Sequence, residues 1–214
     1  MRAGDPFRLM AAAALAGCQG PWNNPYPAEE RGRNILYSAF SEQPKHLDPV
    51  QSYFENEIQF TAQIYMPPLQ YHYLKRPYEL VPFAADRLPT ATYYDAGGRV
   101  LPQDVPAARV ARTVYRVTIR PGIYYQPHPA FATKADGTSR YIGVPAQALS
   151  RYRSLGEFEH TGTRELRAAD FAYQIKRLAH PWLHSPIYGL MSGYIVGLKG
   201  YAEKLREAAA DAPR

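Results

Sequence analysis

The stretch LRAADFAYQIKRL, residues 166–178, carries the clearest helical pattern in the chain. Three of its apolar residues recur at i, i+4 and i+7, a spacing that places them on one face of a helix: Phe171, Ile175 and Leu178. Asp170 lies in the first turn, where the helix dipole favours a negative charge, and Pro181 follows the stretch and stops a helix. The pattern predicts a helix from about Ala168 to Leu178.

Strand patterns precede this helix. Residues 114–120, VYRVTIR, alternate strictly, so Tyr115, Val117 and Ile119 are expected on one face of a strand. Shorter apolar and aromatic runs predict a buried first strand at 34–40, a strand at 69–74 and an extended segment at 78–85. A turn is expected at 95–98 (DAGG), because glycine and aspartate favour turn conformations.

Two further helices are expected, one between the first two strands and one near the end of the sequence. The first runs from Glu55 to Tyr65, with Ile58, Ala62 and Tyr65 on its apolar face. The second is charged and begins near Tyr201. Residues 126–164 are rich in Gly, Pro and Thr, show little periodicity, and predict a long surface insertion.

The N-terminus has the pattern of an export signal. Arg2 and Arg8 are followed by an apolar run of eight residues, 9–16, which is too short to span a bilayer. The run ends in LAGC at 15–18, which resembles the lipobox of bacterial lipoproteins and implies cleavage before Cys18 and lipid on its sulfur. The alternative is a chance alanine-rich start with a buried cysteine. Residues 1–17 are therefore predicted to be a lipoprotein signal peptide, and 18–33 a tether.

Composition narrows the possible classes of function. The 214 residues are 46% hydrophobic and 21% charged, which is typical of a globular chain, and they include 18 Tyr and 20 Pro. The net charge of +6 is scattered, without a basic run interleaved with aromatics, so nucleic acid is not expected as a partner. The single cysteine excludes an internal disulfide.

The sequence offers no catalytic or metal centre that its spacing supports. His180 and His184 are four residues apart, but Pro181 lies between them and no carboxylate or cysteine completes a ligand set. No Gly-x-Ser-x-Gly elbow and no glycine-rich phosphate loop occurs. Neither an enzyme nor a cofactor is therefore expected, and a hydrolase remains the weakest hypothesis.

Four stretches in order resemble the family 5 extracellular solute-binding proteins, which include the oligopeptide- and dipeptide-binding proteins of ABC transporters. They are Leu47-Asp48-Pro49; Ile64 to Leu69 with Glu79 to Ala85, similar to "IyepLl…l.P.lAe"; Tyr115 to Tyr125, similar to "y.f.LrpgvkF"; and Leu166 to Leu178, similar to "vtAeDvvyslkRl". His180-Pro181 and Ser185-Pro186 continue the last match. The family's "w.DG.p" turn is missing, and Arg167 stands where the family has a threonine helix cap, so Thr163 is a candidate substitute cap.

The resemblance implies a fold, a site and partners. The fold would be an α/β, periplasmic-binding-protein type II-like one, here its N-terminal lobe segment with an accessory domain, built on a mixed sheet with flanking helices. Because the family has several hundred residues in two lobes, residues 34–214 are expected to be an incomplete solute-binding domain that exposes apolar surface. Residues that the family places near a peptide correspond to Tyr53, Phe54, Glu55, Ile187 and Tyr188.

The implied function is peptide binding for an ABC transporter permease. The protein would be held in the periplasm or cell envelope by a lipid anchor in the membrane. The alternative is a stand-alone envelope lipoprotein that acts as an interaction or structural module. The sequence does not identify the ligand.

Overall fold

The computed structural model describes residues 26–210, and the chain divides between Ser41 and Glu42 into two units. The predicted signal peptide and Cys18 lie outside the described residues. In the first unit a short 3-10 helix, η1 (Ala28–Glu30), is followed by an extended segment, and the rings of Tyr26 and Tyr37 stack with their centroids 3.5 Å apart. The predicted strand at 34–40 is wrong: no described strand pairs with it, and Leu36 is 93% exposed. An apolar run forms a strand only beside a hydrogen-bonding neighbour.

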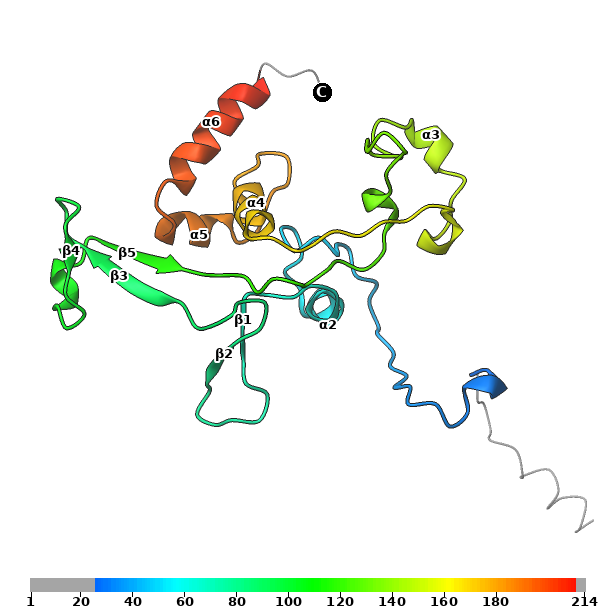
Figure 1. Ribbon diagram of the computed structural model, residues 1–214, viewed down its shortest axis with the longest axis horizontal. Coiled ribbons are helices and arrows are strands. Elements are labelled where there is room, and N and C mark those ends of the chain that lie inside the picture. The colour runs from blue at the N-terminus through cyan, green and yellow to red at the C-terminus, as the bar shows by residue number, and fades with distance from the viewer. Residues whose placement is uncertain (1–25, 211–214) are drawn as a thin grey trace, which may run out of the picture. The chain divides into compact units, whose positions relative to one another are not determined.

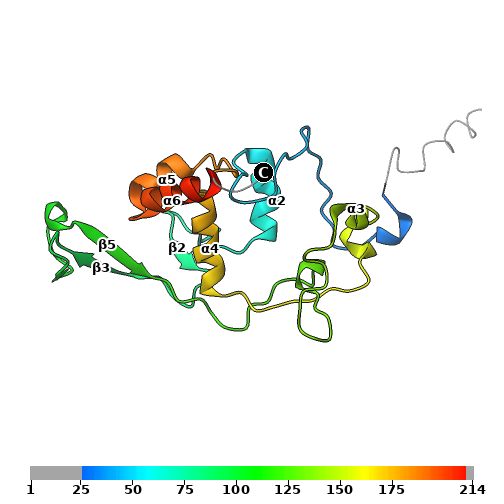
Figure 2. The same cartoon turned by 90° about the horizontal axis from the view of Figure 1, so that it is seen from above.

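The second unit, Glu42–Arg214, contains both helices and strands (Figure 1, Figure 2). Its strands are β1 (Leu69–Tyr71), β2 (Leu80–Pro82), β3 (Thr90–Tyr94), β4 (Val100–Leu101) and β5 (Arg112–Arg116). Its α-helices are α2 (Glu55–Ile64), α3 (Ala146–Leu149), α4 (Ala168–Leu178), α5 (Tyr188–Tyr194) and α6 (Leu198–Ala210), with 3-10 turns η2 (Ala107–Arg109), η3 (Pro129–Phe131) and η4 (Leu155–Glu157). The chain is therefore α/β in the broad sense, as expected.

The strands form two small antiparallel sheets, β1-β2 and β4-β3-β5 (Figure 1). The prediction of one mixed sheet is thus wrong for the described residues. The β1–β2 and β3–β4 connections are short, and a parallel pair needs a crossover of about a dozen residues or more. The predicted turn at 95–98 joins β3 to β4, where the Gly98 N–H donates to the Asp95 carbonyl at 3.0 Å.

The strand expected at 114–120 is shifted towards the N-terminus. β5 ends at Arg116, which pairs with Thr90, the first residue of β3. The chain then changes partner, and the Arg120 N–H donates to the Ala84 carbonyl at 2.9 Å. The periodic pattern therefore covers two successive pairings rather than one strand, because β3 offers no residue before Thr90 to continue the ladder.

The helix at Ala168–Leu178 is confirmed with the predicted bounds. Its first turn is not capped by Thr163, whose hydroxyl donates to the Tyr125 carbonyl instead. The Asp170 carboxylate accepts the Arg167 N–H at 2.8 Å and also pairs with the Arg164 guanidinium. A carboxylate at the third helical position satisfies an N-terminal donor as one half of a capping box does.

The best-packed apolar cluster lies between α5 and α6 and the end of α4. Ala179, Leu198 and Ala202 are buried there, and partly buried side chains surround them: Tyr188, Met191, Ile195 and Leu205. Helix α2 behaves differently, because its only buried residue is Glu57 while its expected apolar face is exposed, with Ile58 at 52%. Apolar surface is therefore exposed on α2.

The predicted insertion at 126–164 is irregular apart from three short helical turns. His128 and Gly162 exchange backbone hydrogen bonds of 2.9 and 3.1 Å where the insertion begins and ends. A Cβ added at Gly162 would lie 2.1 Å from the Phe131 carbonyl oxygen, so the closure requires glycine. Within residues 26–210, none of the helices is both long enough and apolar enough to cross a bilayer.

Candidate functional site

A buried carboxylate organises the loop that precedes α2. Glu57 is 1% exposed, and its Oε1 accepts the backbone N–H groups of Lys45 at 3.2 Å and His46 at 3.0 Å. Its Oε2 accepts those of Tyr53 at 3.0 Å and Phe54 at 3.3 Å. Burial raises the pKa of the carboxyl, but the backbone donors favour the charged form more strongly and lower the pKa to about 2. Residues 45–57 are therefore tied around one ionised group, and we call them the Glu57 loop.

The Glu57 loop is joined to helix α4 by an ion pair. Both carboxylate oxygens of Asp48 accept hydrogen bonds from the Arg177 guanidinium, with 3.0 Å between Nη1 and Oδ1. The two side chains are 27% and 25% exposed. Burial raises the pKa of Asp48, and the hydrogen bonds from Arg177 and from the Val50 N–H outweigh burial and lower it. The pair fixes α4 against a loop that lies 129 residues earlier in the chain.

Backbone hydrogen bonds connect the remaining stretches. Residues 83–85 meet 119–120: Ala85 forms a bridge with Ile119, and the Arg120 guanidinium donates to the Phe83 carbonyl. Residues 122–123 meet 165–166: the Gly122 N–H donates to the Glu165 carboxylate at 2.7 Å, and the Leu166 N–H donates to the Ile123 carbonyl at 2.8 Å. A continuous series of contacts thus runs from residues 83–85 to α4 and on to the Glu57 loop.

The Glu57 loop presents two of the predicted ligand-binding residues to solvent. Tyr53 and Phe54 are 60% and 59% exposed although their backbone N–H groups are bound to Glu57. The Lys45 ammonium lies 5.6 Å from the centroid of the Phe54 ring. Glu55 is exposed and is the first residue of α2. Fixed backbone with free aromatic rings is an arrangement that can stack against a ligand with little loss of conformational entropy.

The other two predicted residues have a different setting. Ile187 precedes the first turn of α5, and Tyr188 begins the helix. Both are half-buried, and Tyr188 packs against the Ala179–Leu198 cluster. No hydrogen bond or ring contact among the described residues joins this pair to residues 53–55. Tyr188 is therefore a partly buried packing residue of the α5–α6 cluster.

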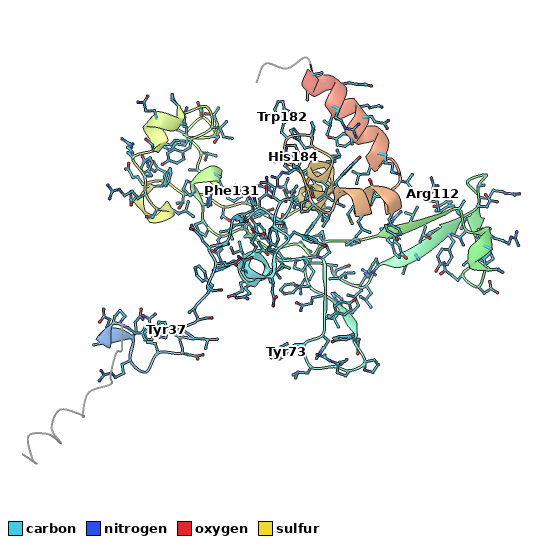
Figure 3. All side chains as sticks on the ribbon, turned by 180° about the vertical axis from the view of Figure 1, so that it is seen from behind. Tyr37, Tyr73, Arg112, Phe131, Trp182 and His184 are labelled. Atoms are coloured by element: carbon cyan, nitrogen blue, oxygen red, sulfur yellow. The ribbon has the colours of Figure 1, made fainter. Side chains whose placement is uncertain are left out.

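The histidines near α4 show no metal centre. His180 and Trp182 place their rings edge to face, with centroids 5.5 Å apart. His184 has a φ of 47°, and its position near Trp182 is shown in Figure 3. In the part of the chain that the structure describes, no group of three or more His, Cys, Asp or Glu side chains is placed to hold a metal ion.

Sequence reasoning missed the two groups that organise this region. Glu57 stands three residues after Phe54, the helix N-cap, and a glutamate in that position is a known helix-start signal. That signal could have identified it. Arg177 carried no comparable signal, because its partner Asp48 is remote in sequence and reads as an ordinary turn residue.

Comparisons of the chain with family models, with curated proteins and with solved structures found no match. What the chain does has to be inferred from its own residues and contacts.

Proposed function

We propose that this chain is a substrate-binding lipoprotein of an ABC-type peptide uptake system, similar to the family 5 extracellular solute-binding proteins. It would bind extended peptides or similar solutes and deliver them to a permease. The proposal rests on four stretches in family order, behind a lipobox. Those stretches contain Asp48, residues 79–85, residues 115–125 and residues 166–178.

The observation that carries the proposal is that these stretches contact one another. Asp48 of the first stretch pairs with Arg177 of the fourth. Residues 84–85 of the second bond to residues 119–120 of the third, and the Leu166 N–H of the fourth donates to the Ile123 carbonyl of the third. A common fold requires the four matched stretches to lie in contact with one another, and these contacts support the proposal in that sense.

In this proposal the Glu57 loop is part of the peptide site. Tyr53 and Phe54 would pack against peptide side chains, because their rings are exposed on a backbone that the Glu57 carboxylate holds in place. A cleft needs a second wall, which a further polypeptide segment would supply. The exposed apolar side chains of α2, including Ile58 at 52% and Ile64 at 59%, support such a covering segment.

Peptide uptake in the bacterium that carries the chain tests this function. Deleting the gene should lower the uptake of a labelled pool of short peptides, and the intact chain should restore it. The double variant Tyr53→Ala/Phe54→Ala should weaken uptake about tenfold, because two aromatic contacts are lost. The matched control, Tyr115→Ala/Tyr194→Ala, removes two other exposed rings and should restore uptake fully. Unchanged uptake after deletion would refute the peptide function.

Lipid attachment is tested separately. Cells fed radioactive palmitate should label the intact chain, and Cys18→Ala should abolish the label and release the protein from the membrane fraction. A chain that carries no label with Cys18 intact would remove the lipoprotein part of the proposal and leave the peptide experiment unaffected.

A further inference from the structure

The connection between β1 and β2 presents large apolar side chains to solvent. We call residues 72–79 the hairpin tip. Tyr73 is 88% exposed, Leu74 76% and Tyr78 70%. Tyr73 is labelled on this connection in Figure 3. Such exposure at adjacent positions has an energetic cost in water, so the tip is a candidate contact surface.

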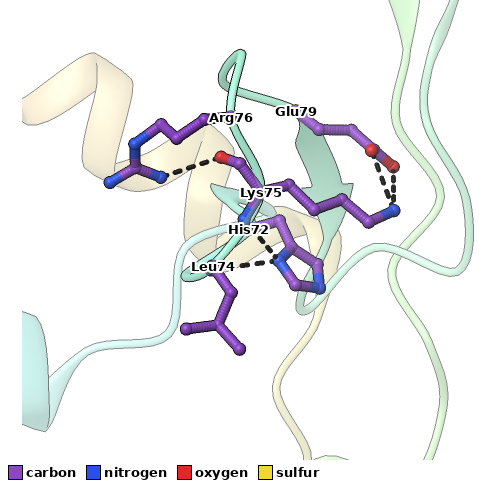
Figure 4. A network of polar contacts seen from close by, with 5 residues as sticks. All are labelled: His72, Leu74, Lys75, Arg76 and Glu79. Carbon is purple, nitrogen blue, oxygen red and sulfur yellow. Dashed lines mark hydrogen bonds and ion pairs between the residues drawn. The ribbon is translucent and has the colours of Figure 1, made fainter.

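The tip is an ordered turn held by its own polar groups (Figure 4). Nδ1 of His72 accepts the N–H groups of Leu74 at 3.2 Å and Lys75 at 3.3 Å. The His72 N–H donates to the Glu79 carbonyl at 2.7 Å, and the Lys75 ammonium lies 2.8 Å from the Glu79 carboxylate. These bonds satisfy backbone donors at the end of the hairpin without using the side chains of Tyr73 and Leu74.

Arg76 completes the turn. Its guanidinium donates to the Lys75 carbonyl at 2.8 Å and lies 4.4 Å from the centroid of the Tyr78 ring. The Tyr78 ring meets the Tyr71 ring edge to face, with centroids 5.8 Å apart. The tip therefore combines the exposed side chains of Tyr73 and Leu74 with the ring pair Tyr71–Tyr78 and the cations of Lys75 and Arg76.

We propose that the hairpin tip docks on the surface of an anionic lipid bilayer. Leu74 and Tyr73 would enter the interface, where tyrosine places its ring among the acyl chains and its hydroxyl in water. The Arg76 guanidinium would lie at the level of the lipid phosphates and be attracted to them, whereas the Lys75 ammonium is paired with the Glu79 carboxylate. The internal hydrogen bonds pair the backbone N–H groups of His72, Leu74 and Lys75, which lowers the cost of moving this part of the tip out of water.

A docking surface for a protein partner is the competing explanation for exposed apolar residues. The combination favours the membrane, since outward tyrosine and leucine beside lysine and arginine is the composition of interfacial anchors. A single membrane-binding signal holds a protein weakly, whereas two signals together hold it firmly. In the cell, the tip would be near a membrane because of the proposed lipid attachment at Cys18. The experiment below uses a chain that cannot be lipidated, so its result does not depend on that attachment.

The test uses the full chain with Cys18→Ser, which has no acceptor for lipid and no other native cysteine. Leu74→Cys is labelled with the polarity-sensitive fluorophore NBD, and Ile142→Cys, whose native side chain is 79% exposed in the insertion, is the matched control. Vesicles of phosphatidylcholine, alone or mixed equally with phosphatidylglycerol, are titrated in. Emission at 74 should rise and shift to the blue, more with the anionic lipid, while emission at 142 stays constant.

A second pair of variants tests the role of the Arg76 guanidinium. With the label at 74, Arg76→Gln should raise the lipid concentration for half-saturation about fivefold. Arg151→Gln, which also removes an arginine lying over a tyrosine ring, should leave it unchanged. Constant emission at 74, or equal changes at 74 and 142, would overturn the proposal. Because the chain carries no lipid, either result is independent of whether Cys18 is lipidated or peptides are bound.

Discussion

The Asp48–Arg177 ion pair allows a quantitative test of how the Glu57 loop is held to α4. Asp48→Asn keeps the shape of the side chain but replaces Oδ2 by an amide that donates hydrogen bonds. That amide faces the Nη2 donor of Arg177, so one of the two bonds is lost, while Oδ1 still accepts from Arg177 and Val50. Arg177→Gln removes the cation from the other side.

The size of the effect follows from burial and geometry. Fully exposed ion pairs contribute about 0.2–1 kcal/mol, and hydrogen bonds to charged groups about 1.5–3 kcal/mol. The Asp48 and Arg177 side chains are about one-quarter exposed and their contact is bidentate, so the pair lies between these limits. We expect a coupling free energy of about 1.5 kcal/mol, equivalent to a fall of roughly 3–6 °C in Tm.

A double-mutant cycle measures that coupling. Far-UV circular dichroism monitors urea unfolding of four proteins: the parent, Asp48→Asn, Arg177→Gln and the double variant. Their four free energies of unfolding give the coupling. The control cycle is Lys75→Gln with Glu79→Gln, a pair in which both side chains are 51% exposed, and its coupling should stay below about 0.5 kcal/mol. Equal coupling in the two cycles would refute the view that Arg177 fixes α4 to the loop.

Three further predictions concern the buried groups. Glu57 has a native pKa of about 2 against an ordinary 4.5, so its stabilisation of the fold is complete above about pH 4.5 and is lost as pH falls towards 2. Glu57→Gln should lower the urea midpoint at pH 7, and between pH 4.5 and 2 the midpoint of this variant should depend less on pH than that of the parent. Gly162→Ala should destabilise the chain by about 1–3 kcal/mol because its Cβ meets a backbone oxygen at 2.1 Å, whereas Gly156→Ala, with 3.9 Å of space, should be nearly neutral in the same unfolding assay. Leu198→Ala should cost about 2–4 kcal/mol because Leu198 is 4% exposed, and Leu190→Ala, at 63% exposed, should change the free energy of unfolding by less than about 0.5 kcal/mol.

Helices were more predictable from sequence than strands in this chain. The periodicity of residues 166–178 gave the bounds of α4, because a helix makes its hydrogen bonds within one segment. Residues 34–40 have an equally apolar composition and form no strand among the described residues. A strand depends on a partner elsewhere in the chain, and the pattern of one segment contains no information about that partner.

Sequence reasoning selected five residues for the candidate site, and their role in binding a ligand stays a prediction. Tyr53, Phe54 and Glu55 were selected by family resemblance, and the structure places them on an ordered loop with their side chains exposed. Tyr188 was selected in the same way and lies against the α5–α6 cluster. A family resemblance predicts which positions lie near a ligand, but whether the side chain at such a position is buried depends on which helices pack around it.

By itself, the sequence determined the helix at 168–178 and the irregular composition of 126–164, since each depends on neighbouring residues. Only the tertiary structure decided that Glu57 is buried and that Asp48 meets Arg177 across 129 residues. A charge is stable away from water only where donors surround it. Those donors come from backbone groups and side chains that the folded chain brings together, so their arrangement cannot be read from local composition.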